Sequence, residues 1–163
     1  MEKLNYDNLI DLIISINNSM DDELENLYLY KKSVDDQENK ISELFMHKIL
    51  FFIYGGFYKN FQKDLFEPNF EAWKYGPVEI DYRKEFKKNN EPNFQKFNLN
   101  KLKLNNEEKK YLKTTLSNLL KNSPWNLVSI SHDTIAWKNR YSPDSNNKIF
   151  KEDIIESFKN ILI

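Results

Sequence analysis

The clearest pattern in the chain is an amphipathic repeat that begins at Ile41. Apolar residues recur at spacings of three and four with polar residues between them, as on one face of an α-helix. These apolar residues are Ile41, Leu44, Phe45, Ile49, Phe52 and Ile53. From Ile49 to Tyr54 the segment is apolar nearly all round, which predicts a central, buried helix. The Gly55-Gly56 pair is expected to loosen this helix and to introduce a bend.

Similar repeats predict helices along most of the remaining chain. The predicted helices cover about residues 6–18, 79–88, 107–120, 124–132, 134–140 and 149–163. Capping residues are expected before three of them: Asn105 or Asn106, Ser123 ahead of Pro124, and Asp133 or Thr134. A polar turn is expected over 142–147. The predicted fold class is therefore mainly α, a compact single-domain helical bundle.

The exception is a short extended and turn segment predicted over residues 65–78. Its last nine residues read F-E-A-W-K-Y-G-P-V. Pro77 fixes its own φ and moves the preceding residue away from the α region, so a sharp turn is expected at Gly76-Pro77. Trp73 and Tyr75 are two residues apart, so both rings are expected to point to one side and to pack on the helical core.

Length and composition favour one folding unit. A chain of 163 residues can bury about two-thirds of its unfolded surface in a single core. We expect an N-terminal helix with an acidic, insertion-like segment over residues 1–40, followed by a helical domain over residues 41–163. The absence of cysteine excludes disulfides and fits a cytoplasmic location. The first residues lack a signal-peptide pattern and no apolar run reaches the length of a membrane span, so no membrane contact is expected.

No residue pattern typical of catalysis or metal binding is found. The two histidines, His47 and His132, do not occur in a metal-ligand spacing such as H-E-x-x-H. Ser131, His132 and Asp133 are adjacent, and adjacent residues cannot meet as members of a catalytic triad do. We instead expect His132 to be buried and to hold a helix end through hydrogen bonds. Three glycines leave no phosphate-binding loop. The sequence thus predicts a protein that is not an enzyme and has no cofactor.

The charge is distributed unevenly along the chain. Residues 1–40 contain 10 acidic and 4 basic residues, whereas residues 81–121 contain 11 basic and 5 acidic residues. The basic stretch leaves open a nucleic-acid-binding role. However, its basic residues are nearly all lysine, no helix-turn-helix is recognisable, and the net charge of the chain is −1. Lysines on solvated helix faces are the simpler explanation, so nucleic acid is not the expected partner.

Three motifs of the chain together match the pattern of a known domain family. The central motif E-A-W-x-Y-G-P-V is matched by Glu71, Ala72, Trp73, Tyr75, Gly76, Pro77 and Val78. An early L-x-K-L-L-Y-F element is similar to residues 46–52, which include Lys48. A later element with a Ser-His pair and a tryptophan is matched by Ser131, His132 and Trp137. Over about residues 41–158 the chain thus resembles the Panacea domain family of SocA-like antitoxins, whose members are often described only as phage-associated proteins.

The chain departs from the family pattern in two places. Arg83 stands where a tyrosine often follows the G-P-V turn, with Tyr82 beside it. The segment over residues 19–40 is longer than expected between the first two helices.

The resemblance implies a non-catalytic antitoxin that binds and neutralises a toxin encoded nearby. A proteolytic adaptor that delivers a toxin to a protease is an alternative, and a nucleic-acid-binding regulator using residues 81–121 is another. The motif residues are mostly apolar, aromatic or turn-forming, so we expect them to hold the fold. The candidate partner-binding residues are therefore the charged ones outside the motifs, Asp21, Asp22, Glu23, Glu25, Lys84, Lys87 and Lys88.

Overall fold

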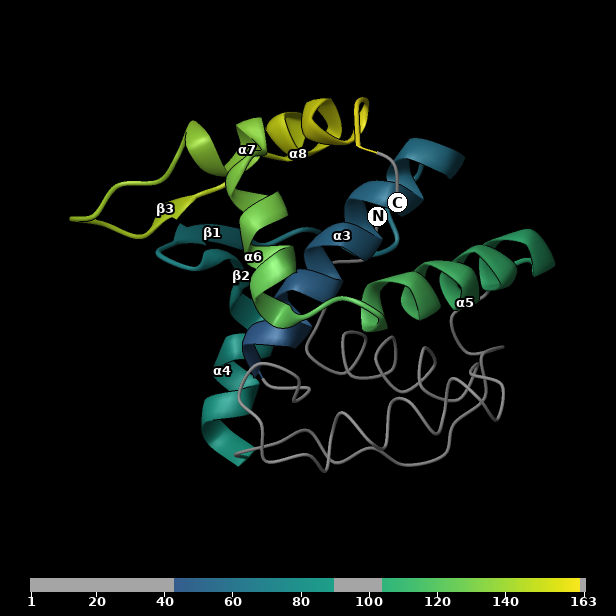
Figure 1. Cartoon of the computed structure of the whole chain (residues 1–163), viewed down its shortest axis with the longest axis horizontal. Coiled ribbons are helices and arrows are strands. Elements are labelled where there is room, and N and C mark those ends of the chain that lie inside the picture. Colours follow the sequence, from purple (N-terminus) through teal and green to yellow (C-terminus); the bar gives the residue numbers. More distant parts are fainter. Residues whose placement is uncertain (1–42, 90–103, 162–163) are drawn as a thin grey trace.

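The computed structural model describes residues 43–89 and 104–161 of the chain (Figure 1). The described part contains six helices and three short strands. The helices are α3 (Glu43–Phe61), α4 (Ile80–Asn89), α5 (Asn106–Leu120), α6 (Pro124–His132), α7 (Ile135–Lys138) and α8 (Lys151–Phe158). The strands are β1 (Phe70–Trp73), β2 (Gly76–Glu79) and β3 (Asn147–Lys148). The helix predicted over residues 6–18 and the acidic segment after it lie outside the described residues.

The predicted mainly α class is confirmed, but the description as a helical bundle is incomplete. The three strands form one antiparallel sheet in the order β2-β1-β3. The extended segment predicted over residues 65–78 covers the β1–β2 hairpin except for its last residue, Glu79. β3 was not predicted, because two polar residues next to a turn carry no alternating apolar pattern.

The hairpin turns earlier than the sequence predicted. Its turn residues are Lys74 and Tyr75, since Trp73 pairs with Gly76 across the two strands. Pro77 therefore lies inside β2 and does not form the turn. Proline, which has no backbone N–H to donate, is accepted there because β2 is an edge strand and is paired on one side only.

The burial predicted for the hairpin rings was also wrong. Phe70 and Ala72 alternate toward the core and are fully buried. Trp73 is only half-buried, and Tyr75 at the turn is 46% exposed. The prediction placed Trp73 and Tyr75 in one continuous extended segment, but the turn begins directly after Trp73 and removes Tyr75 from the strand.

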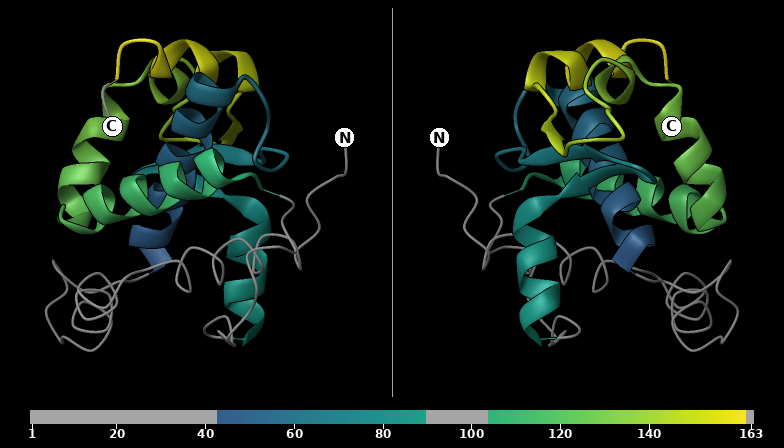
Figure 2. Two further views of the ribbon diagram at one scale, coloured as in Figure 1. Left: turned by 90° about the vertical axis from the view of Figure 1, so that its right-hand side faces the viewer. Right: turned by 90° about the vertical axis from the view of Figure 1, so that its left-hand side faces the viewer.

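Helix α3 is the centre of the fold. Every residue from Phe45 to Phe57 is buried, because α5, α6, α8 and β2 all pack against it (Figures 1 and 2). Several of the contacts are between aromatic rings; Phe51, for example, lies 5.6 Å from Phe70 and 5.4 Å from Phe158, measured between ring centroids. None of the helices in the described ranges is long and apolar enough to span a bilayer.

The Gly55-Gly56 pair lies inside α3, which continues without interruption to Phe61. A Cβ atom on Gly55 would lie 2.1 Å from ring carbons of Phe158 on α8. Glycine is therefore needed at this position for the close approach of α8, and not for loosening the helix.

Local capping signals were predicted correctly. Asn105 accepts a hydrogen bond from the N–H of Glu108, Ser123 caps α6 ahead of Pro124, and Thr134 caps α7. The final helix begins at Lys151 and not at Ile149, because the N–H of Ile149 donates to the carbonyl of Phe70 on β1 at 2.8 Å.

Candidate functional site

The β1–β2 hairpin rests on α3 through a buried lysine. Lys48 is fully buried, and its Nζ donates a hydrogen bond of 2.7 Å to the carbonyl oxygen of Pro77. Burial lowers the pKa of Lys48 to about 7, although the carboxylate of Glu43 acts in the opposite direction. Lys48 thus joins the central helix to the edge strand of the sheet.

Gly76 completes this contact because it has no side chain. Its φ of +99° lies in the left-handed region that favours glycine. A Cβ atom there would lie 2.7 Å from Cε of Lys48 and 2.5 Å from Oγ of Ser131. Ser131 is itself buried and donates to the carbonyl of Val128 at 2.7 Å within α6. Residues from α3, β2 and α6 therefore meet at one glycine.

The other strand of the hairpin, β1, is held beside the turn by Trp137. Its indole Nε1 donates a hydrogen bond of 2.8 Å to the carbonyl oxygen of Trp73. The Trp137 ring stacks on His132 at a centroid distance of 4.0 Å and on Tyr141 at 4.4 Å. The rings of His132, Trp137 and Tyr141 therefore form one continuous stack, with Trp137 in the middle.

The expected role of His132 needs correction. Its side chain is only partly buried, and its Nε2 atom has no hydrogen-bond partner in the described part of the chain. The end of α6 is instead closed by the backbone N–H of Asp133 and by Thr134, whose Oγ1 donates to the carbonyl of Ser131 at 2.6 Å. Burial lowers the pKa of His132, with the backbone of Lys74 acting against that shift. His132 therefore stacks on Trp137 and hydrogen-bonds the backbone of Lys74 at the hairpin turn, and it does not close the end of α6.

A buried polar cluster joins the start of α3 to the start of α4. The N–H of Glu79 donates to Nδ1 of His47 at 3.1 Å, so the His47 proton lies on Nε2 and points to Oε1 of Glu43, also at 3.1 Å. Arg83 Nη1 lies 2.6 Å from both oxygens of Glu43. Burial lowers the pKa of His47 to about 4, which keeps the ring neutral in this arrangement.

The two carboxyl groups of this cluster differ in charge. Burial alone would raise the pKa of Glu43, but hydrogen bonds from His47 and Arg83 hold the pKa below its usual value. Glu79 is fully buried, and burial raises its pKa to about 8. Its Oε2 accepts from the N–H of Tyr82 at 2.7 Å and so caps α4, whereas Oε1 has no partner in the described ranges. Glu43 is therefore an anion at neutral pH and Glu79 is mainly a neutral acid.

Sequence reasoning missed this cluster. Its members come from α3, β2 and α4, so no fixed spacing links them. One signal was available: His47 and Lys48 interrupt an otherwise apolar helix, and polar side chains buried in such a helix need partners elsewhere. Arg83, which appeared only as a departure from the family pattern, supplies one of those partners.

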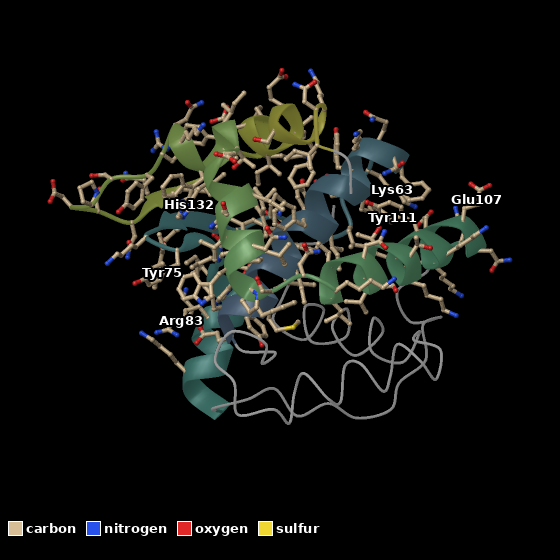
Figure 3. The ribbon with its side chains drawn as sticks, viewed as in Figure 1. Lys63, Tyr75, Arg83, Glu107, Tyr111 and His132 are labelled. Atoms are coloured by element: carbon tan, nitrogen blue, oxygen red, sulfur yellow. The ribbon has the colours of Figure 1, made fainter. Side chains whose placement is uncertain are left out.

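An open pocket of about 340 Å³ lies between the start of α3, the hairpin turn and α4. Its lining residues are Glu43, Leu44, His47, Trp73, Lys74, Tyr75, Val78 and Arg83. At its edge the Tyr75 ring meets Trp125 of α6 edge-to-face, with 5.3 Å between the ring centroids. Figure 3 shows Tyr75 and Arg83 on the same side of the molecule, away from Glu107 at the far end of α5.

Comparison with protein-family models matches residues 46–138 to the family described as antitoxin SocA-like, Panacea domain. The chain belongs to this family. The matched region runs from Met46, near the start of α3, to the end of α7, and includes the hairpin and its contacts with Lys48, Ser131 and Trp137. The pairing of β1 with β3 lies outside it. No curated protein and no solved structure matches the chain.

Within the Panacea domain, the motif residues occupy two kinds of position. Those that are buried in or against the hairpin are Lys48, Ala72, Gly76, Pro77, Val78 and Ser131. Those that remain partly or largely exposed are Glu71, Trp73, Tyr75, His132 and Trp137. Glu71 accepts a hydrogen bond of 2.8 Å from Nε1 of Trp73. The motif thus includes residues that hold the hairpin and residues that the hairpin presents to solvent.

The candidate partner-binding residues lie in different parts of the chain. Lys84 and Lys87 are exposed on α4, beyond the pocket. Lys88 is on the same helix, but its side chain lies outside the described part. Asp21, Asp22, Glu23 and Glu25 lie outside the described residues as well. Among the described residues, no group of three or more His, Asp or Glu side chains is arranged to hold a metal ion.

Proposed function

We propose that this chain is the antitoxin of a toxin–antitoxin pair, and that it neutralises a toxin encoded beside it by direct, non-catalytic binding in the cytoplasm. The observation that carries the proposal is the family match over residues 46–138, whose described function is that of an antitoxin.

The chemistry of the described residues supports binding in place of catalysis. Several buried polar groups of the domain bind other groups of the domain: Lys48 bonds the Pro77 carbonyl, His47 bonds Glu43, and Glu79 caps α4. Such contacts fix a surface in one shape, and a fixed surface binds a partner at a lower entropic cost. The residues that remain exposed beside them, Tyr75 and Trp125, are of the types that most often dominate protein interfaces.

The experiment is a toxicity-neutralisation test with the product of the neighbouring gene. Expressed alone, that product should stop growth, and co-expression of the full chain should restore growth. Tagged chain should retain the toxin during purification, and the purified complex should have no toxin activity. Growth arrest that persists with well-folded chain, together with no complex, would refute the proposal.

The adaptor alternative makes a different prediction in the same cells. If the chain delivers the toxin to a protease, toxin protein disappears when the chain is present and remains in a strain that lacks the protease. If the chain acts by binding alone, toxin protein stays at a constant level while its activity is lost. Nucleic-acid binding through residues 81–121 would instead give a complex with DNA or RNA that weakens steeply with salt.

A further inference from the structure

We propose that the pocket between α3, the hairpin turn and α4 receives an apolar or aromatic side chain of the toxin, next to a toxin carboxylate that pairs with Lys74. This proposal rests on the proposed antitoxin function and names the contact through which it operates.

The shape and lining of the pocket suit a single anchoring side chain. Its volume of about 340 Å³ is at the lower end of the range for specific small binding pockets. Leu44, Val78 and Trp73 supply apolar walls. Aromatic or aliphatic anchors that fill such pockets account for most of the affinity at protein interfaces.

The aromatic rim extends the apolar surface beyond the pocket. Tyr75 is 46% exposed and Trp125 is 44% exposed, and their rings contact each other edge-to-face. Lys74 lies over the Tyr75 ring, with Nζ 5.3 Å from the ring centroid. Two large rings held together at a turn present contact area without a large loss of side-chain freedom on binding.

The charges around the pocket select an anionic partner. The carboxylate of Glu43 already accepts hydrogen bonds from His47 and Arg83, so it is not available to a cation from the toxin. The nearby carboxylate of Glu71 accepts from Trp73.

The cations, by contrast, are mostly unneutralised. Lys74 makes no ion pair in the part of the chain that the structure describes, and the same holds for the exposed Lys84 and Lys87 on α4. A carboxylate beside the anchor would therefore meet a positive field, whereas a lysine or arginine would be repelled.

The test compares pocket variants with matched controls in the full chain, with the co-purified product of the neighbouring gene as the probe. Tyr75→Ala removes the rim ring, and its control is Phe150→Ala, which removes another exposed aromatic with a cation over its ring, next to β3. Lys74→Glu reverses the pocket charge, and its control is Lys113→Glu on the exposed face of α5.

Tyr75→Ala should raise Kd about tenfold or more, mainly through faster dissociation. Lys74→Glu should slow association and reduce its salt dependence. Both controls should stay within about twofold of the parent. All four side chains are exposed, so melting curves should be nearly unchanged.

Four results would overturn the proposal. If the parent binds the toxin and neither Tyr75→Ala nor Lys74→Glu changes Kd or the association rate relative to its control, the pocket is not the contact and the antitoxin function stands. Faster association of Lys74→Glu would show a basic occupant. Loss of binding to a single-stranded oligouridine probe in both variants, with toxin binding unchanged, would assign the pocket to nucleic acid. If the parent itself binds no toxin, the proposed function has failed and this contact fails with it.

Discussion

The ring of Phe158 lies directly over Gly55, so closely that a Cβ atom on Gly55 would be 2.1 Å from Cδ2 of that ring. Phe158 is fully buried and also contacts the rings of Phe51 and Phe52 on α3. The final helix is therefore attached to the central helix at a position where only glycine fits.

Gly55→Ala should destabilise the fold. Alanine is favoured over glycine inside a helix by about 1 kcal/mol, but here its methyl group would displace the Phe158 ring, and overpacking of this kind costs roughly 1–3 kcal/mol. Urea unfolding measures the difference. In a Phe158→Ala background the cost of Gly55→Ala should shrink, because Cγ, Cδ2 and Cε2 of the ring, the atoms that clash, are gone. A Gly55→Ala protein at least as stable as the parent would contradict this account of the contact.

The buried amine of Lys48 should make stability depend on pH. Its pKa is lowered to about 7 in the folded state, so between pH 8 and 9.5 the unfolded chain binds a proton that the folded chain does not. The free energy of unfolding should therefore rise with pH in this window, by about 1 kcal/mol per pH unit. Urea unfolding across the window measures the slope.

Lys48→Met is the matched variant, since it keeps the length of the side chain and removes the titrating group. Its free energy of unfolding should be lower overall and should change less with pH over the same range. The neighbouring Glu79, whose pKa is raised to about 8, has the opposite effect, and that effect is mostly complete below this window. Equal slopes in the parent and in Lys48→Met would show that the amine does not titrate as described.

Trp137→Phe should cost roughly 0.5–1.5 kcal/mol, the usual net value of one hydrogen bond. The indole Nε1 of Trp137 donates to the carbonyl of Trp73, and phenylalanine preserves the stacking partner of His132 while removing the donor. Trp125→Phe is the control, because Trp125 is 44% exposed, and it should change stability by less than about 0.5 kcal/mol. Equal thermal shifts for the two variants would argue against an anchoring role for Trp137.

Charge reversal at Asp21, Asp22 and Glu23 should slow toxin association and make it less salt-dependent, with little change in melting temperature. The motive is the excess of 10 acidic over 4 basic residues in residues 1–40, which would steer a toxin with a basic groove. Reversal of three exposed carboxylates elsewhere, Glu107, Asp144 and Glu156, controls for the change in net charge. Identical association rates for the two triple variants would remove the acidic segment as a steering element.

The features that could be read from the sequence are those set by neighbours along the chain. The buried stripe of α3 and the caps at Asn105, Ser123 and Thr134 depend on residues within one or two turns, and they were predicted correctly. The strand β3 was missed because Asn147 is ordered by pairing with Ala72, far away along the chain.

The candidate site was harder to predict from the sequence, because its residues also come from parts of the chain that are far apart. The restricted backbone of proline correctly indicated a constrained segment. However, Pro77 lies in the edge strand β2, and not in a turn, and its carbonyl accepts a hydrogen bond from Lys48. The pocket depends on Glu43, Tyr75 and Arg83 from three elements, and no single-chain spacing brings them together. The aromatic residues of the hairpin could be read from the sequence. The exposure of Tyr75 could not, because it depends on where the turn lies.

The meeting of α3, β2 and α6 at Gly76 has a consequence for how the chain is made. The ribosome releases the hairpin well before Ser131, so during synthesis Gly76 has Lys48 on one side and nothing yet on the other. The central strand of the sheet, β1, also has no partner on its second edge until β3 has been synthesised. Contacts so distant in sequence delay folding. A nascent chain truncated before α6 would thus leave the hairpin without its support, and full-length synthesis should precede any capture of the toxin.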